Sequence, residues 1–287
     1  MDGNLQKYDA FIKTAELGSF TRAAEALAYS QSSVSKMIAD LEQEWGIRLL
    51  ERSKSGAVLT TDGASMLPYV RGLLEEARRM QGHVDDLLGI QSGTIRIGTA
   101  ASVATHWLPN VIRAFRRDYP KIEYELLIGD YGEMEQWVAD GRVDLGILRT
   151  PTRPEFDTIP LWPDEMVVIM PKGHPLAAKS SIDPLDLNDQ DFVLMSQSGQ
   201  TETNEILERY QLHPNIRFFA WDDTAVAAMV EAGLGIGILP QLILMRTPYQ
   251  IETRSFTEPY YRELAIAVRD EQKLSAAVRR FLSYMKP

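Results

Sequence analysis

The sequence contains no cysteine among its 287 residues. A disulfide framework, a thiolate metal site and a cysteine nucleophile are therefore excluded, and the absence is typical of a protein in a reducing compartment. Long apolar runs are also missing: no segment approaches the roughly 18 apolar residues of a membrane span, and the start, "MDGNLQKYDAFIKTAE", lacks the basic and apolar regions of a signal peptide. We expect a cytoplasmic protein without a membrane partner.

Positive charge is scarce as well. Lysine and arginine number 30 against 40 aspartates and glutamates, for a formal net charge of −10. This balance argues against a protein that coats nucleic acid or an anionic membrane, although it leaves room for a small DNA-reading face. The 4 histidines are scattered without metal-ligand spacing, so the sequence predicts neither a metal site nor a cofactor. A hydrophobic content of 45% over this length predicts two or three domains.

The chain changes in character twice along its length. Residues 4–61 read as closely spaced short helices followed by a two-stranded turn with Gly56 at its tip, and residues 62–89 read as one long helix. A candidate coiled-coil seam recurs three and four residues apart along the long helix: Leu67, Val70, Leu74, Ala77, Gln81, Val84 and Leu88. We favour a dimer contact for this seam; packing on the helix's own domain is the alternative.

From residue 93 onward, short β-branched runs alternate with helical segments. Runs such as "TIRIG", "VDLGIL", "MVVIM" and "GIGIL" are separated by stretches with helical periodicity. This alternation is typical of parallel α/β units. The predicted fold class is therefore α/β, with an all-α N-terminal part.

The stretch "SQSSVSKMIADLEQEWG", residues 30–46, predicts an amphipathic helix with its N-cap at Ser30. One side of the projected helix is apolar and carries Val34, Ile38, Leu41 and Trp45. The other side is small and polar with a single cation, and carries Gln31, Ser32, Ser35, Lys36, Ala39 and Gln43. The two sides of this helix are therefore expected to have different roles: the apolar side packs in the core, and the polar side is available to contact a partner.

Upstream, "SFTRAAEALAY" predicts a preceding helix in which Ala23 and Ala24 let another helix approach closely. The pair matches a helix-turn-helix, whose second helix enters the major groove. Glutamine can bond adenine, serine can meet base edges or phosphates, and lysine can reach guanine or phosphate. A capping cluster on a solvated face is the alternative for the serine-rich start.

These two helices, extended to "FIKTAELGSFTRAAEALAYSQSSVSKMIADLEQEWGIRLLERS" and "LTTDG", closely resemble the winged helix-turn-helix of LysR-type transcriptional regulators. The resemblance implies a DNA-binding domain over residues 1–61, a linker (dimerisation) helix over 62–89 and an effector-binding domain over 93–287. That last domain would have the fold of type 2 periplasmic binding proteins. One subdomain would be built from 93–160 and 264–287, the other from 161–263.

In that family the recognition helix and the wing contact DNA. The resemblance points here to Thr21, Arg22, Gln31, Ser32, Ser35, Lys36, Arg52 and Lys54, of which Thr21 and Arg22 would face phosphates and Arg52 and Lys54 lie in the wing. It also implies homodimers or homotetramers, double-stranded promoter DNA and RNA polymerase as partners. Through residue 62, 7 lysines and arginines stand against 9 aspartates and glutamates. We therefore predict that useful affinity comes from coupling two or four copies.

In the α/β part, the resemblance implies a small-molecule effector in a cleft, past the carboxyl ends of strands and beside helix N-termini. The loops "TAASVAT", "LRTP" and "MSQSGQTETN" meet this condition. Their candidate contacts are Ala100, Ala101, Ser102, Arg149, Thr150, Ser196, Ser198 and Thr201. Because arginine pairs bidentately with carboxylates and oxyanions, Arg149 favours a small carboxylate or other anion. The alternatives are a surface ion pair for Arg149 and plain helix caps for Ser102, Ser196 and Thr201.

Two other classes of protein share parts of this pattern. An enzyme would need a nucleophile or an acid–base pair, but Ser198 lacks the G-x-S-x-G spacing, and Asp222 and Asp223 open a helix as caps. A solute receptor of a transporter would share the α/β part, but the helical N-terminal part counts against it. The sequence therefore predicts a regulator rather than an enzyme.

Overall fold

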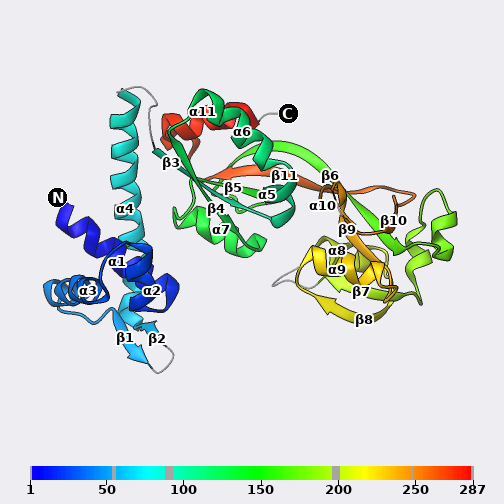
Figure 1. The fold of residues 1–287 in the computed structure, drawn as a ribbon, viewed down its shortest axis with the longest axis horizontal. Coiled ribbons are helices and arrows are strands. Elements are labelled where there is room, and N and C mark those ends of the chain that lie inside the picture. The colour runs from blue at the N-terminus through cyan, green and yellow to red at the C-terminus, as the bar shows by residue number, and fades with distance from the viewer. Residues whose placement is uncertain (1, 54–55, 88–92, 196–200, 247, 286–287) are drawn as a thin grey trace. The chain divides into compact units, whose positions relative to one another are not determined.

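The computed structural model describes residues 2–53, 56–87, 93–195, 201–246 and 248–285, which divide into two compact units (Figure 1). The first unit comprises residues 1–89 with a short segment, 140–142, and the second comprises the rest of the chain. Each unit has its own buried apolar core. None of the described helices combines the length and the apolar character that a membrane span requires.

The first unit is a helix-turn-helix followed by a two-stranded antiparallel wing and a long helix. Its elements are α1 (Asp2–Leu17), α2 (Phe20–Ala26), α3 (Gln31–Trp45), β1 (Leu50–Ser53), β2 (Gly56–Leu59) and α4 (Thr61–Leu87). The side chain of Ser19 caps α2 by accepting from the N–H of Arg22, and that of Ser30 caps α3 by accepting from the N–H of Ser33 at 3.1 Å. Left-handed Gly46 ends α3. The predicted cap at Ser30 is confirmed.

The apolar side of α3 closes the core of this unit. Val34, Ile38 and Leu41 are buried in one cluster with Ala23 and Ala24 of α2. Because an alanine side chain is a single methyl group, α2 and α3 can pack closely at this point. The predicted division of α3 into an apolar and a polar side is confirmed by this packing.

A close backbone contact at Gly56 holds the wing against the turn between α1 and α2. The N–H of Ala57 donates to the carbonyl oxygen of Gly18 at 2.8 Å, and Gly56 itself has a φ of +126°. A Cβ atom on Gly56 would lie 2.1 Å from the same carbonyl oxygen. Both the backbone conformation and the close approach therefore require glycine.

Gly56→Ala is expected to lower the free energy of unfolding of the first unit by roughly 2 kcal/mol or more, because the added methyl group must displace the wing. Thermal unfolding of the full chain measures the change. Gly72→Ala is the matched control: no atom lies within 4 Å of its Cβ position, inside α4. That substitution should stabilise the helix by about 0.5–1 kcal/mol. Equal effects of the two variants would contradict the argument.

The long helix α4 is buried on one side and exposed on another. Val70 and Leu74 lie in the core of the first unit, at 0% and 7% exposure. Their interpretation as dimer contacts is therefore wrong, because their own unit covers them; Leu88 lies outside the described residues. Four large apolar side chains are exposed on α4, and of these Val84 alone belongs to the predicted seam: Tyr69 (71%), Leu73 (52%), Met80 (59%) and Val84 (42%). At 100° per residue these four fall on one side of the helix, and we call them the α4 stripe.

The second unit is built on a mixed sheet. Its strands are β3 (Gly93–Thr99), β4 (Ile122–Ile128), β5 (Leu145–Arg149), β6 (Asp157–Pro171), β7 (Asp191–Met195), β8 (Asn215–Ala220), β9 (Gly237–Pro240), β10 (Ile251–Arg254) and β11 (Tyr260–Val268). The order in the main sheet is β10-β6-β11-β5-β3-β4, with β9 also paired to β6, while β7 and β8 pair with each other in parallel. Strands β4, β3 and β5 run parallel, whereas β11 is antiparallel to both β5 and β6. The sheet is therefore not wholly of the parallel type that the alternation suggested.

Helices cover both faces of this sheet (Figure 1). They are α5 (Ala101–His106), α6 (Leu108–Asp118), α7 (Tyr131–Ala139), α8 (Glu202–Arg209), α9 (Asp223–Glu231), α10 (Gln241–Leu244) and α11 (Ala276–Met285), with short 3₁₀ turns at Pro175–Ala178, Pro184–Leu187 and Glu271–Lys273. Helices α6 and α11 share one apolar core with β3 and β5, whereas α7 belongs to a second cluster. The four helices α5, α7, α8 and α9 begin beside a common pocket, described below.

Strands β6 and β11 pass through both halves of the second unit. Residues 157–166 of β6 pair with β11, and residues 166–171 pair with β9 and β10. The apolar side chains of the second stretch belong to separate cores from those around β3 and β5. Both boundaries expected between subdomains, after residues 160 and 263, thus fall inside continuous strands.

Candidate functional site

The polar side of α3 is accessible in the first unit. Gln31, Ser32 and Lys36 are exposed, and Ser35 is half-buried. The hydroxyl of Ser30 lies 2.9 Å from that of Ser32 and 2.8 Å from that of Ser33, so the start of the helix presents a cluster of hydroxyl groups. Lys36 has no ion-pair partner within the part of the chain that the structure describes. Its ammonium group is therefore free to meet a phosphate or a base edge.

The other residues predicted to contact DNA flank this helix. Thr21 and Arg22 are exposed in the first turn of α2, and the Arg22 guanidinium donates to the carbonyl oxygen of Leu17. Arg52 lies in β1, but its side chain is outside the described residues, as is the whole of Lys54. The structure thus brings Thr21, Arg22 and the start of α3 into one helix-turn-helix.

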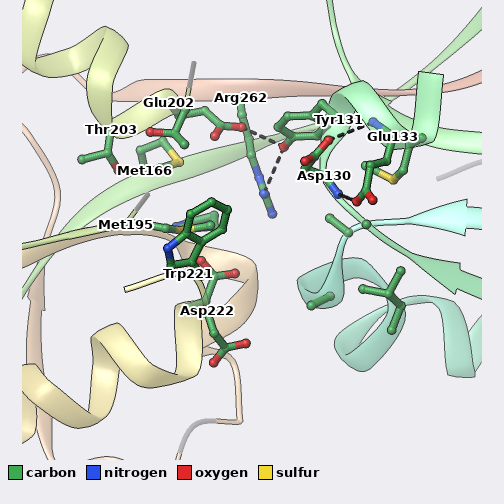
Figure 2. Close-up of a pocket in the computed structure, with 18 of the residues that line it drawn as sticks. Asp130, Tyr131, Glu133, Met166, Met195, Glu202, Thr203, Trp221, Asp222 and Arg262 are labelled. Carbon is green, nitrogen blue, oxygen red and sulfur yellow. Dashed lines mark hydrogen bonds between the residues drawn. The ribbon is translucent and has the colours of Figure 1, made fainter. Parts of the chain in front are cut away.

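A pocket of about 370 Å³ lies in the second unit (Figure 2). This volume is near the lower end of the roughly 300–1,000 Å³ range of small-molecule sites. The starts of α5, α7, α8 and α9 line it, with residues of β6 and β11 behind them. In Figure 2, Trp221 and Asp222 lie on one side of the space, and Asp130 and Tyr131 on another. The arrangement suits one small organic molecule.

Arg262, on β11, is the one basic side chain among the described residues that line the pocket. It is buried, and its Nε and Nη2 donate to Asp164 Oδ2 on β6 at 2.9 and 2.6 Å. Its Nη2 also donates to Ser102 Oγ at 2.9 Å, and its Nη1 to Tyr131 Oη at 3.4 Å. Although burial alone would lower the pKa of Arg262, Tyr131, Asp164 and Glu202 raise it. This arginine is permanently charged, and Asp164 balances the charge.

Among the acids that line the pocket, Glu202 is buried and Asp223 is half-buried. Glu202, in the first turn of α8, is 8% exposed and accepts from Tyr131 Oη at 2.8 Å. Burial raises the pKa of Asp223 to about 6; Arg262 opposes the rise, and the charge of Asp222 adds to it. Burial also raises the pKa of Tyr131, so its hydroxyl stays protonated and donates to Glu202.

The effector contacts predicted from the sequence divide into three groups. Ala100, Ala101 and Thr201 line the pocket, and Thr201 also caps α8. Ser102 is buried behind the lining, where Arg262 binds it. Ser196 and Ser198 lie outside the described residues.

Arg149 and Thr150 are not among the residues that line the pocket. Arg149 Nη1 lies 2.8 Å from Glu205 Oε2, and its guanidinium stands over the Tyr131 ring, 5.6 Å from the centroid. The hydroxyl and the N–H of Thr150 both point to the carbonyl of Glu263. The ion-pair alternative therefore describes Arg149, and its use as the anion-binding cation of the pocket is not supported.

Sequence reasoning did not place the starts of α7 and α9 or the central arginine in the pocket. Asp130 and Glu133 look like ordinary caps of α7, which they also are. Arg262 lies in a strand that was not predicted, since charged residues interrupt its apolar run. A charged residue inside "YYRELAIAV" is the signal that could have found it.

Two family descriptions match the chain. Residues 5–64 match "Bacterial regulatory helix-turn-helix protein, lysR family", and residues 89–287 match "LysR substrate binding domain". The HTH-type transcriptional regulator YvbU of Bacillus subtilis is 31% identical over 96% of this chain and 95% of its own length. A full-length OxyR variant of Pseudomonas aeruginosa is 26% identical, with a TM-score of 0.75 over 98% of this chain and 93% of that one. CbnR, solved in complex with its target DNA, shares the fold at 21% identity, with a TM-score of 0.70 over 98% of each chain.

Proposed function

The chain belongs to the LysR family of transcriptional regulators, and on that premise we propose that it binds promoter DNA through α2, α3 and the wing and responds to a small effector in the pocket of its second unit. Its relatives are regulators and not enzymes. The observation that carries the DNA-binding part is the exposed polar side of α3, which is capped at Ser30 and backed by a buried apolar side. Because promoter DNA is the proposed target, the cytoplasm is the proposed location.

The base-reading surface is proposed to be Gln31, Ser32, Ser35 and Lys36, with Thr21 and Arg22 on the phosphates. Glutamine supplies a bidentate pair for adenine, and the serines are small enough for the backbone to lie close to the groove. Arg52 and Lys54 are proposed wing contacts to the sugar–phosphate backbone. A two-fold pair of such domains would read a partly palindromic site.

Lys36→Ala is expected to weaken operator binding at least tenfold and to reduce the salt dependence of binding, because it removes the exposed cation of the α3 face. The operator is first selected from a library of random duplexes, and affinity is then measured by fluorescence anisotropy at several salt concentrations. Lys121→Ala removes an exposed lysine in the second unit and is the matched control. Equal loss of affinity in both variants would contradict the assignment of the α3 face.

Assembly into a dimer is proposed to run through the α4 stripe. The DNA-binding part of one copy has a slight excess of negative charge, since 7 basic and 9 acidic residues lie within residues 1–62, so a single copy should bind DNA weakly. Coupling of two copies multiplies the phosphate contacts without improving either domain. We further propose that two such dimers form a homotetramer and that this homotetramer contacts RNA polymerase.

The effector part of the proposal rests on a pocket of small-molecule size lined by the starts of four described helices. We do not propose an anionic effector on the basis of Arg149, because Arg149 pairs with Glu205. Since β6 and β11 connect both sides of the pocket, a ligand that touches both sides would favour one relative orientation of them. Thermal shift of the full chain with a metabolite library tests whether the pocket binds any ligand.

A further inference from the structure

The pocket of the second unit has an excess of negative charge. Five carboxylates belong to its described lining, namely Asp130, Glu133, Glu202, Asp222 and Asp223, against the single guanidinium of Arg262. Asp164 already balances that guanidinium. The segment 196–200, which lies outside the described residues, reads SQSGQ and adds no charge. An anionic ligand would therefore meet a field of its own sign.

Two of the four helix starts beside the pocket, those of α7 and α9, are capped by the protein's own carboxylates. At α7, Asp130 accepts from the N–H of Glu133 at 2.8 Å, and Glu133 accepts from the N–H of Asp130 at 3.1 Å. At α9, Asp222 accepts from the N–H of Ala225 at 3.0 Å. These carboxylates also neutralise the positive ends of the helix dipoles. The attraction of these two N-termini for an anion is thus already satisfied, whereas α8 is capped by the neutral hydroxyl of Thr201 and the short helix α5 has no side-chain cap.

Asp223 differs from the capping acids because part of it has no partner. Its Oδ1 is buried and makes no hydrogen bond to any residue that the structure describes. A buried carboxylate oxygen without a donor is costly and calls for an explanation, and a bound ligand that donates to it is one. The raised pKa of Asp223 has the same physical cause. A ligand with N–H donors and a positive charge would give Oδ1 a hydrogen-bond donor and would stabilise the charged form of the Asp223 carboxyl.

An aromatic side chain stands beside these acids. Trp221 is 67% exposed and lines the pocket next to Asp222 (Figure 2). The face of an indole ring attracts organic cations, and the combination of aromatic rings and carboxylates is typical of sites for amines. A metal ion is a poor alternative, since the described residues contain no group of three or more histidines, aspartates or glutamates that could hold one.

We propose that the ligand of this pocket carries a protonated amine, which the carboxylates of Glu202 and Asp223 bind while the Trp221 ring covers it. This inference rests on the proposed function, because it assigns a chemical class to the effector of the same pocket. Glu202 keeps one oxygen on Tyr131 Oη, so the amine adds to an existing hydrogen-bond network. The pocket volume of about 370 Å³ accommodates an amine of amino-acid or diamine size.

Three probes of one chain length test the charge preference on the full chain: 1,5-diaminopentane, 5-aminopentanoate and glutarate. Isothermal titration calorimetry at pH 7.5 is expected to give binding of both amines, and binding of glutarate at least tenfold weaker than that of the diamine. Glutarate binding more tightly than either amine would overturn the proposal. Failure of both amines to bind at about 10 mM would overturn it as well, since two carboxylates in a partly enclosed site should give measurable affinity.

Variants of the two acids locate the amine. Glu202→Gln and Asp223→Asn are each expected to raise the Kd of the diamine about tenfold or more. Glu258→Gln removes the same charge on an exposed turn and should leave that Kd unchanged. Asp223→Asn should also raise the Tm of the ligand-free chain at pH 7.5 by at least about 3 °C, because it removes a carboxylate charge that burial disfavours. Unchanged diamine affinity in both acid variants would overturn the assignment.

The affinity for the diamine should fall as the pH is lowered through about 6, where Asp223 takes up a proton. The charged groups that face Asp223 are Arg262 of β11, Glu202 of α8, Asp164 of β6 and the neighbouring Asp222. The primary amines stay protonated throughout this range.

Duplex binding by the same preparation separates the two proposals. A chain that binds DNA but prefers glutarate contradicts only the proposal of an amine ligand. A chain that binds the amine but no duplex contradicts only the proposed function.

Discussion

Replacing Arg262 by methionine is expected to lower the free energy of unfolding of the second unit by about 3–5 kcal/mol. Arg262 lies directly opposite Asp164 in the β6–β11 pairing, and the two side chains are 5% and 4% exposed. The variant would leave the Asp164 carboxylate buried without its counter-charge. Because a domain is stable by only roughly 5–15 kcal/mol, this loss is a large share of the total.

Urea unfolding followed by tryptophan fluorescence measures this effect on the full chain. The second unit contains Trp107, Trp137, Trp162 and Trp221. Arg217→Met is the matched control, because Arg217 pairs with Asp191 at the surface, where the two side chains are 60% and 54% exposed, and such pairs contribute at most about 1 kcal/mol.

The double variant Arg262→Met with Asp164→Asn tests the reason for the loss. It removes both charges, and the asparagine can still accept from the N–H of Leu242, as Asp164 does at 3.0 Å. We expect the double variant to be more stable than Arg262→Met alone. A double variant less stable than the single one would show that packing, and not the buried charge, accounts for the effect.

Placing glutamates at Leu73 and Met80 is expected to convert the assembled protein to monomers and to weaken operator binding by about 100-fold or more. Leu73 and Met80 are 52% and 59% exposed within their own unit, so the fold of a single copy does not require them. Two glutamates on each facing helix would bring like charges together in the proposed dimer contact. Light scattering after gel filtration measures the mass, and anisotropy measures the affinity.

The control for this variant adds the same charge outside the α4 stripe. Ala64 and Gln81 are exposed on α4 but project at other angles, so Ala64→Glu with Gln81→Glu should keep both the assembly and the affinity. Circular dichroism of both variants checks that α4 remains helical. Retention of the dimer by the stripe variant would exclude the stripe as the contact.

The helix-turn-helix could be predicted because its signals are local. The cap at Ser30, the apolar spacing of α3 and the small residues of α2 all lie within a short stretch of sequence, and the structure has each of them. The seam on α4 was predicted less well. Periodicity shows that one side is apolar, but it cannot show whether the core of the same unit covers that side, as it does for Val70 and Leu74.

The pocket could be predicted only where a helix follows a recognisable strand. The starts of α5 and α8 were identified for that reason, and Ala100, Ala101 and Thr201 line the pocket. The charge of the pocket depends instead on pairings distant in sequence. Arg262 and Asp164 are 98 residues apart, and nothing local in the sequence indicates that Glu205 binds Arg149. The sign of the charge presented to a ligand follows from those pairings.

The continuity of β6 and β11 has a mechanical consequence. Both strands cross between the two cores as one ribbon, with β6 running unbroken for 15 residues and the register shifting once, between Glu263 and Ala265. A pair of strands joined by hydrogen bonds resists stretching and shear but twists readily about its long axis. We therefore expect ligand-dependent motion to be a rotation of one half against the other, with the shift beside Arg262 as its pivot, rather than a jaw-like opening about flexible loops.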